Sequence, residues 1–215
     1  MLEEHSNRRT FPLDRHAGAV IAGVAADGRA VINRAQSEAA NYKSFYGDPI
    51  PGHVLAERVA SYMHVFNLYW YVRPFGVCSL LAIYDREGPQ LYLVDPAGTM
   101  HRYNGCAVGK GRQGAKNEIE KLKLAELSCR EAINAIAKMY VYIVILNVFV
   151  SLTIIILMFP LVCCRLHQVH DEEKGFEMEM AWICDDSNRQ FQRVPNELVN
   201  EADRLAKESL EAEDM

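Results

Sequence analysis

The sequence predicts an α+β fold, in which antiparallel strands and pairs of helices alternate along a chain of 215 residues. Short apolar or alternating runs separated by turn residues are typical of hairpin strands. Between them, apolar residues recur at three- or four-residue spacing, as in amphipathic helices. No repeat of fixed period indicates a solenoid, and one domain is the simplest interpretation of the length. We expect strands, a helix pair, strands, a helix pair, strands and a final helix.

The N-terminal half is predicted to contain a buried strand, two helices and a meander of short strands. His16 to Ala26 is small and apolar, which suits a strand buried on both faces. Asp27-Gly28 is expected to cap a helix over Ala30 to Tyr46. A second helix is expected over Leu55 to Tyr69, ended by Pro74. Turn residues separate the meander strands, which are expected at Val77 to Tyr84, Gln90 to Val94, Met100 to Tyr103 and Cys106 to Val108.

The C-terminal half is predicted to continue with helices and two more strands. A charged helix is expected over Lys110 to Lys123. Ser128 and Glu131 form a capping-box pattern that predicts the start of the next helix. Pro195 is expected to open a final amphipathic helix. Alternation predicts the remaining strands, at Phe176 to Ile183 and Phe191 to Val194.

Composition excludes several classes of function. The net charge of −5, with Lys and Arg interleaved among acids, indicates no nucleic-acid partner, because phosphate binding needs a basic face. The six cysteines form no Cys-x-x-Cys pair, and no glycosylation acceptor occurs, so reduced thiols are expected. The polar stretch from Met1 to Arg15 lacks the apolar core of a secretory signal. We therefore expect a cytoplasmic and nuclear protein.

Two motifs could be taken for ligand sites. Gly109 to Gly114 matches the dinucleotide-binding pattern G-x-G-x-x-G. However, Glu131, the acid about twenty residues on, falls in a predicted helix, and the preceding strands are predicted to be antiparallel. We therefore interpret the glycines as allowing close packing of strand and helix. Lys110 is also followed by Gly111 where a phosphate loop needs Ser or Thr. The cluster His167, His170 and Asp171 lacks a fourth metal ligand and is interpreted as a solvated helix end. His53, His64 and His101 fit no catalytic constellation, and we expect no metal and no cofactor.

Four motifs in the same order resemble the α subunits of the proteasome core particle. They are Arg73-Pro74-Phe75-Gly76, Asp95-Pro96-Ala97-Gly98, Gly105-Cys106-Ala107-Val108-Gly109-Lys110 and Ala206-Lys207-Glu208-Ser209-Leu210. The resemblance implies the four-layer αββα sandwich of N-terminal nucleophile hydrolases. It also implies a non-catalytic, structural member of the outer ring, which contributes to ubiquitin-dependent protein degradation. Its implied partners are neighbouring α subunits, β-ring subunits and, through the assembled ring, proteasome activators.

The same resemblance implies that the first two helices face the catalytic ring, where Arg34, Lys43 and Arg58 are candidates for contact. Catalysis in this fold needs a Thr, Ser or Cys at the mature N-terminus, because the free α-amine is the base. The chain starts at Met1, and its first Thr is Thr10, with no small residue before it. We expect no catalytic residue; a catalytic N-terminal nucleophile hydrolase is the alternative.

The chain departs from the family pattern in two places. Met1-Leu2-Glu3-Glu4 matches the middle of that pattern, which implies an N-terminally truncated form. No charge occurs between Lys138 and Arg165, a run long enough as a helix to span a bilayer. We interpret residues 140–168 as an apolar, transmembrane-like insertion from a retained intron, and residues 1–139 and 169–215 as one domain. The alternative is a single-pass membrane protein with a proteasome-like domain.

Overall fold

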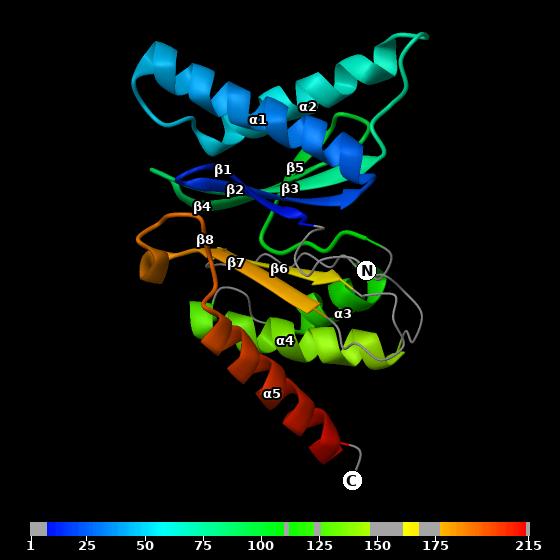
Figure 1. Ribbon diagram of the computed structural model, residues 1–215, viewed down its shortest axis with the longest axis vertical. Helices are drawn as coiled ribbons and strands as arrows, with labels where there is room; N and C mark the ends of the chain where they lie inside the picture. The colour runs from blue at the N-terminus through cyan, green and yellow to red at the C-terminus, as the bar shows by residue number, and fades with distance from the viewer. Residues whose placement is uncertain (1–7, 110–111, 123–125, 147–160, 168–176, 214–215) are drawn as a thin grey trace, which may run out of the picture. The chain divides into compact units, whose positions relative to one another are not determined.

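The computed structural model describes residues 8–109, 112–122, 126–146, 161–167 and 177–213 (Figure 1). The chain forms two compact units, residues 1–103 and 104–215, which are described separately below. Each contains helices and an antiparallel sheet, so the predicted α+β class is confirmed.

The first unit contains a five-stranded antiparallel sheet whose strand order follows the chain, β1-β2-β3-β4-β5. The predicted meander forms its second half, and β2 pairs with β3 from Ala17 opposite Ile83 to Gly23 opposite Val77. The strand at the start was not predicted. The bounds are β1 Thr10–Asp14, β2 Ala17–Gly23, β3 Val77–Asp85, β4 Gly88–Val94 and β5 Met100–Tyr103.

Two helices, α1 (Ala25–Tyr46) and α2 (Gly52–Leu68), lie side by side over one face of this sheet (Figure 1). Their apolar stripes bury against alternate residues of the strands, as the helical and strand periods require. This core contains Ala17, Ala19, Ile21, Val31, Ile32, Ala35, Ala39, Leu55, Ala56, Val59, Met63, Val77, Leu81, Ile83, Tyr92 and Val94.

The structure corrects two predicted helix boundaries and one predicted strand. The first helix begins at Ala25, so Asp27 lies in its first turn and its carboxylate binds Arg73 and Gly76 rather than capping the helix. The second helix ends at Leu68, before Pro74, because Tyr69 already adopts extended backbone with φ −107° and ψ 131°. Residues 106–108 form no strand, since β4 finds its last partner in β5.

The second unit contains β6 (Leu161–His167), β7 (Glu177–Ile183) and β8 (Gln192–Arg193) in one antiparallel sheet. Three helices accompany it, α3 (Arg112–Lys121), α4 (Cys129–Leu146) and α5 (Asn196–Glu213). The predicted capping box is confirmed, because the Ser128 backbone N–H donates to Glu131 Oε2 at 2.8 Å. The core contains Ala115, Ile119, Ala132, Ile133, Ile136, Ala137, Met139, Met180, Trp182, Cys184, Val194, Ala202 and Ala206.

The apolar run after Lys138 does not form one helix in the described residues. Its beginning extends α4 to Leu146, and its end forms the start of β6, in which Leu161 lies opposite Ile183. Within the described ranges, no helix is both long and apolar enough to cross a membrane. His167 ends a strand instead of lying at a helix end, because β6 pairs with β7 up to that residue. The interpretation of residues 140–168 as an insertion stays a prediction.

Candidate interaction surface

The outer side of the α1–α2 pair carries a charge network centred on Glu38. Arg34 Nη2, one helical turn earlier, lies 2.5 Å from Glu38 Oε1, and Arg58 Nη1 of α2 lies 2.9 Å from Glu38 Oε2. Each carboxylate oxygen therefore binds a different arginine. The Glu38 side chain is 13% exposed, so solvent screens this pair of contacts less than it screens a fully exposed ion pair.

The same two arginines also stack on aromatic rings of the opposite helix. The Arg34 guanidinium of α1 lies 5.2 Å from the Tyr62 ring centroid of α2, and Arg58 of α2 lies 5.4 Å from the Tyr42 ring centroid of α1. Both distances fall within cation–π range. Because each arginine contacts a ring of the other helix, the two contacts together favour one register of α1 against α2.

The third candidate, Lys43, lies apart from this network. Its backbone carbonyl accepts the hydrogen bond from Gly47 that ends α1, and its side chain is exposed. No ion pair of the Lys43 ammonium occurs within the described part of the chain. The structure therefore brings two of the three predicted residues together and leaves Lys43 beside the end of the helix.

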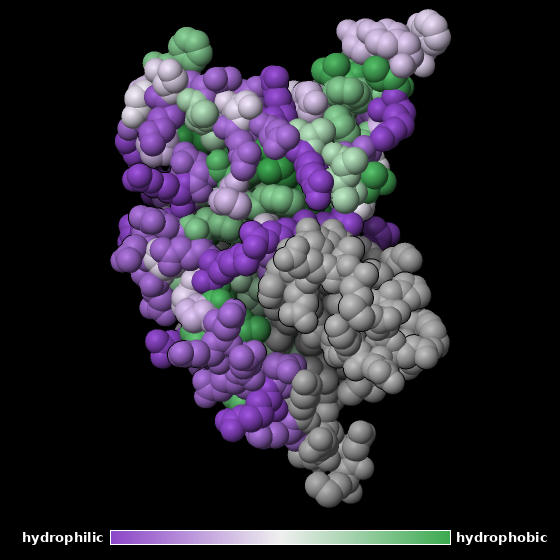
Figure 2. All heavy atoms as spheres, viewed as in Figure 1, coloured by the Kyte–Doolittle hydropathy of each residue, from purple (hydrophilic) through white to green (hydrophobic). Residues whose placement is uncertain are grey.

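Large apolar side chains are exposed at the C-terminal ends of both helices. The α1 end group is Phe45 and Tyr46, and the α2 end group is Leu68 to Tyr71. Trp70 is 95% exposed, and the Tyr69 and Tyr71 rings stack with centroids 5.4 Å apart. Figure 2 shows green apolar atoms at the surface around the end of α2. Clustered exposed apolar and aromatic residues are typical of protein–protein contact surfaces.

A carboxylate–guanidinium clamp holds the loop that follows the α2 end group. Asp27, in the first turn of α1, receives hydrogen bonds from Arg73 Nη1 at 2.6 Å and Nη2 at 2.7 Å, and from the Gly76 backbone N–H at 2.9 Å. Its side chain is 7% exposed. This pair was not predicted from the sequence. The only sequence feature that indicates it is an acid among small apolar residues, followed later in the chain by the Arg-Pro-Phe-Gly motif.

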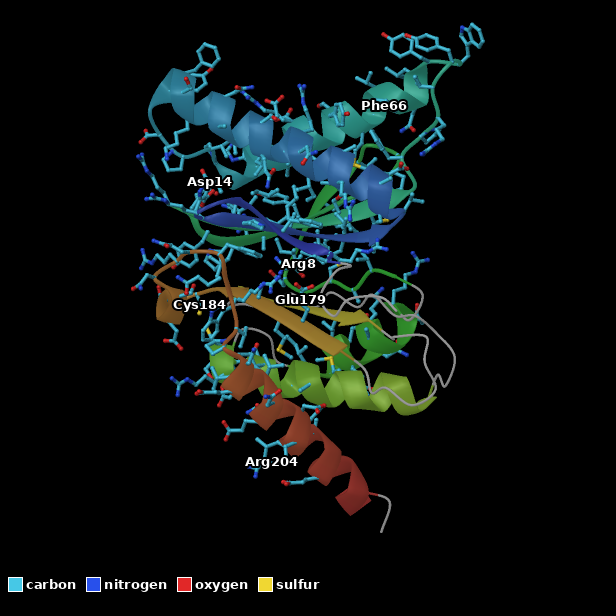
Figure 3. The ribbon with its side chains drawn as sticks, in the orientation of Figure 1. Arg8, Asp14, Phe66, Glu179, Cys184 and Arg204 are labelled. Carbon is cyan, nitrogen blue, oxygen red and sulfur yellow. The ribbon has the colours of Figure 1, made fainter. Side chains whose placement is uncertain are left out.

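Aromatic rings also join α2 to the same loop. The Phe66 ring, labelled in Figure 3, lies 4.5 Å from the Phe75 ring centroid, and Tyr62 lies 5.5 Å from it. Rings at these separations pack favourably in tilted arrangements. Tyr62 also contacts Arg34. The rings therefore connect the loop held by the clamp to the charge network around Glu38.

The clamp predicts a defined acid sensitivity. The hydrogen bonds from Arg73, then that from Gly76, lower the pKa of Asp27 to about 2. A folded-state pKa below the unfolded value of about 3.9 gives stability that is present above pH 4 and lost as the pH falls through 2. We expect Asp27→Asn to lower the urea midpoint at pH 7, with the difference from the parent chain disappearing between pH 4 and pH 2. Circular dichroism at each pH measures this.

Asp14→Asn is the control, because the Asp14 side chain lies in the same unit and contacts the backbone amide of Arg15 and the ring of His16 but takes no part in the clamp. A difference between parent and Asp27→Asn chains that persists unchanged at pH 2 would contradict the clamp.

Among the described residues, the other candidates named from the sequence form no site. Residues 110 and 111 of the glycine motif lie outside the described residues, and the described residues before them, 104–109, form no strand. His170 and Asp171 also lie outside them. His64 Nδ1 lies 3.3 Å from the Ala97 carbonyl oxygen, and His101 packs edge-on against Tyr103. Over the ranges that the structure describes, no group of three or more His, Cys, Asp or Glu could hold a metal.

Comparison with known proteins gives a consistent result. A family model described as a proteasome subunit matches residues 1–146. Proteasome subunit alpha type-3 of Spinacia oleracea is 47% identical over 216 residues, covering 100% of this chain and 76% of the relative. The protein of that name from Arabidopsis thaliana is 45% identical with the same coverage. A probable proteasome subunit alpha type-7 of Schizosaccharomyces pombe is 38% identical, covering 100% and 75%. This chain belongs to the proteasome subunit family.

Proposed function

We propose that this chain is a non-catalytic α-type subunit of the proteasome core particle, corresponding to the α type-3 subunits. It forms part of the outer ring, contacts neighbouring α and β subunits, and meets activators only through the assembled ring. Cytoplasm and nucleus are its proposed locations. The observation that carries the proposal is the similarity, over the whole of this chain and 76% of each relative, to subunits of that name. The aromatic end groups exposed on the helix pair agree with it.

The position of Thr10 supports a structural role over peptide hydrolysis. Thr10 begins β1 opposite Val20, and its nitrogen is part of the peptide bond to Arg9. Arg9 Nη1 in turn donates to the Gly23 carbonyl at 2.5 Å, which ties this residue to the end of β2. An N-terminal nucleophile needs a free α-amine as its base, and an acylated nitrogen cannot accept the proton.

Co-purification with the core particle tests the proposal. When the particle is isolated through a tagged β-type subunit, we expect the chain to be present in stoichiometric amount. Trp70→Ala should lower its incorporation by about tenfold, because truncating an aromatic anchor typically costs over 1 kcal/mol of contact energy. Quantitative mass spectrometry of the isolated particle measures both.

Tyr103→Ala is the matched control, because Tyr103 is also an exposed aromatic residue but lies at the end of β5 and belongs to neither helix end group. Equal incorporation of the parent and the Trp70 variant would contradict the assigned surface. Absence of the parent chain from the particle would contradict the function itself. Peptide hydrolysis by the isolated chain would favour the catalytic alternative.

We further propose that residues 140–168 are inserted in a family domain. The family match ends at residue 146, within the run that lacks charge, which supports this. The insertion would interrupt the chain between two parts of one core, since α4 and β7 both contribute to the same cluster. Peptide mass spectrometry of the native subunit decides whether the mature protein contains this segment.

A further inference from the structure

Two cysteines from distant parts of the sequence meet in the second unit. Cys129 is the first residue of α4, and Cys184 directly follows β7. The Cys184 side chain is fully buried in the core, and Cys129 packs against that same core. Cys184 is also the neighbouring residue that, after burial, most raises the pKa of the Cys129 thiol. Both are free thiols in this structure.

Contacts on both sides hold the two cysteines in place. Next to them in the sequence, Arg130 Nε lies 3.9 Å from Asp186 Oδ2. The Cys184 backbone N–H donates to Ser187 Oγ at 3.0 Å, and the Ser187 hydroxyl lies 3.0 Å from the Cys184 carbonyl oxygen. On the other side, the Ser128–Glu131 capping box fixes the first turn of α4. Figure 3 shows Cys184 at the end of β7.

We propose that Cys129 and Cys184 form a latent disulfide that closes under oxidative stress and clasps the start of α4 to the end of β7. The sequence between them includes residues 140–168, so the clasp closes a loop around the apolar segment. Closing a long loop restricts the unfolded chain and thereby stabilises the fold.

Hydrogen peroxide is a sufficient oxidant. The Cys129 thiolate, which is the more exposed of the pair, attacks one peroxide oxygen, the O–O bond breaks and hydroxide leaves, giving a sulfenic acid. The Cys184 sulfur then attacks the Cys129 sulfur, the S–O bond breaks, and the hydroxyl leaves with the thiol proton as water. The two thiols lose two electrons and two protons, and one peroxide becomes two waters.

The surroundings keep the pair reduced under ordinary conditions. Burial, followed by the hydrogen bond with Cys184, raises the pKa of Cys129 to about 12. The negative charges of the Cys184 thiolate and of Asp186 also raise the pKa of Cys129. Arg130 and Glu131 are the other charged residues in the first turn of the helix. Because the thiolate is the reacting form, the thiol reacts slowly near neutral pH. The clasp therefore responds to sustained oxidation and not to brief exposure.

Peroxide treatment of the full chain tests the proposal. After blocking of free thiols and tryptic digestion without reductant, we expect a disulfide-linked pair of peptides, residues 124–130 and 175–189, that dithiothreitol separates. The oxidised chain should unfold at a urea concentration higher by roughly 1 M. Links that join Cys129 to Cys78 or Cys106 as often as to Cys184 would overturn the proposal.

Serine variants separate the pair from the other thiols. Cys184→Ser and Cys129→Ser should each abolish the linked peptides and the urea shift. Cys78→Ser and the double variant of Cys163 and Cys164 to Ser should retain both. Unchanged far-ultraviolet circular dichroism confirms that each variant folds, and a urea shift that survives in Cys184→Ser would likewise overturn the proposal.

Discussion

Replacing Gly98 by Ala should lower the urea midpoint of unfolding by roughly 1–2 M. Gly98 has φ +80°, and a Cβ there would lie 2.4 Å from His64 Cβ and 2.7 Å from His64 Cα in α2. The left-handed conformation costs a residue with a Cβ about 1–2 kcal/mol, and forcing backbone apart adds about 1–3 kcal/mol. With a denaturant slope of about 2 kcal/mol per molar, the two costs give this shift.

The clash should also release the contacts that join this turn to α2. Asn67 Nδ2 donates to the Pro96 carbonyl at 2.9 Å, and the Gly98 N–H donates to the Asp95 carbonyl at 2.8 Å. Moving the turn away from His64 separates the first pair while leaving the second within the turn. Hydrogen exchange should therefore rise in β5 and in the last turns of α2 before it rises elsewhere in this unit.

Gly47→Ala is the matched control. Gly47 has nearly the same conformation, φ +77°, but nothing lies within 4 Å of the Cβ position. It should show only the conformational cost of about 1–2 kcal/mol. Pulse proteolysis in urea, on chain made by cell-free translation at low concentration, measures all three proteins. Equal midpoints for the two variants would show that α2 does not constrain the Asp-Pro-Ala-Gly turn.

Replacing Leu55 by Ala should destabilise the chain by about 2–5 kcal/mol, because it leaves a cavity between α2 and the sheet. Leu55 is 0% exposed and belongs to the core of the first unit. Its neighbours in that core include Val59 and Met63 on the same helix, whose positions the helix backbone fixes. The site can therefore collapse only partly, and the urea midpoint should fall by roughly 1 M or more.

Leu68→Ala is the control in the same helix, because Leu68 is 61% exposed in the α2 end group. Its effect on the free energy of unfolding should be within about 0.5 kcal/mol. Although Leu68→Ala should fold normally, we expect it to be incorporated into the core particle less well than the parent chain. A Leu68 variant that unfolds as early as the Leu55 variant would show that the end group supports the fold and is not a free surface.

Patterns local in sequence predicted much of the fold. Apolar spacing located α1, α2 and α5, and turn residues located the hairpin of β3 and β4. The Ser128–Glu131 box depends on residues three positions apart, so the sequence alone could specify it. Strand β1 was missed, because its register with β2 depends on pairing across the sheet.

The candidate surface could be predicted only in part. The family resemblance implied a contact surface on the first two helices, with Arg34 and Arg58 among the candidate residues. Their common partner Glu38 was not, because one arginine reaches it within α1 and the other from α2. Likewise, Asp27 was expected to cap a helix, whereas its carboxylate binds Arg73 through two hydrogen bonds.

The sequence by itself determined the α+β class, the family and the positions of most helices and strands, since these depend on period, turn chemistry and short motifs. Only the tertiary structure decided which charged and thiol groups meet, as Asp27 does with Arg73 and Cys129 with Cys184. Such pairs join residues far apart in the chain. Their energies depend on burial and on distances of a few ångströms, which no local pattern encodes.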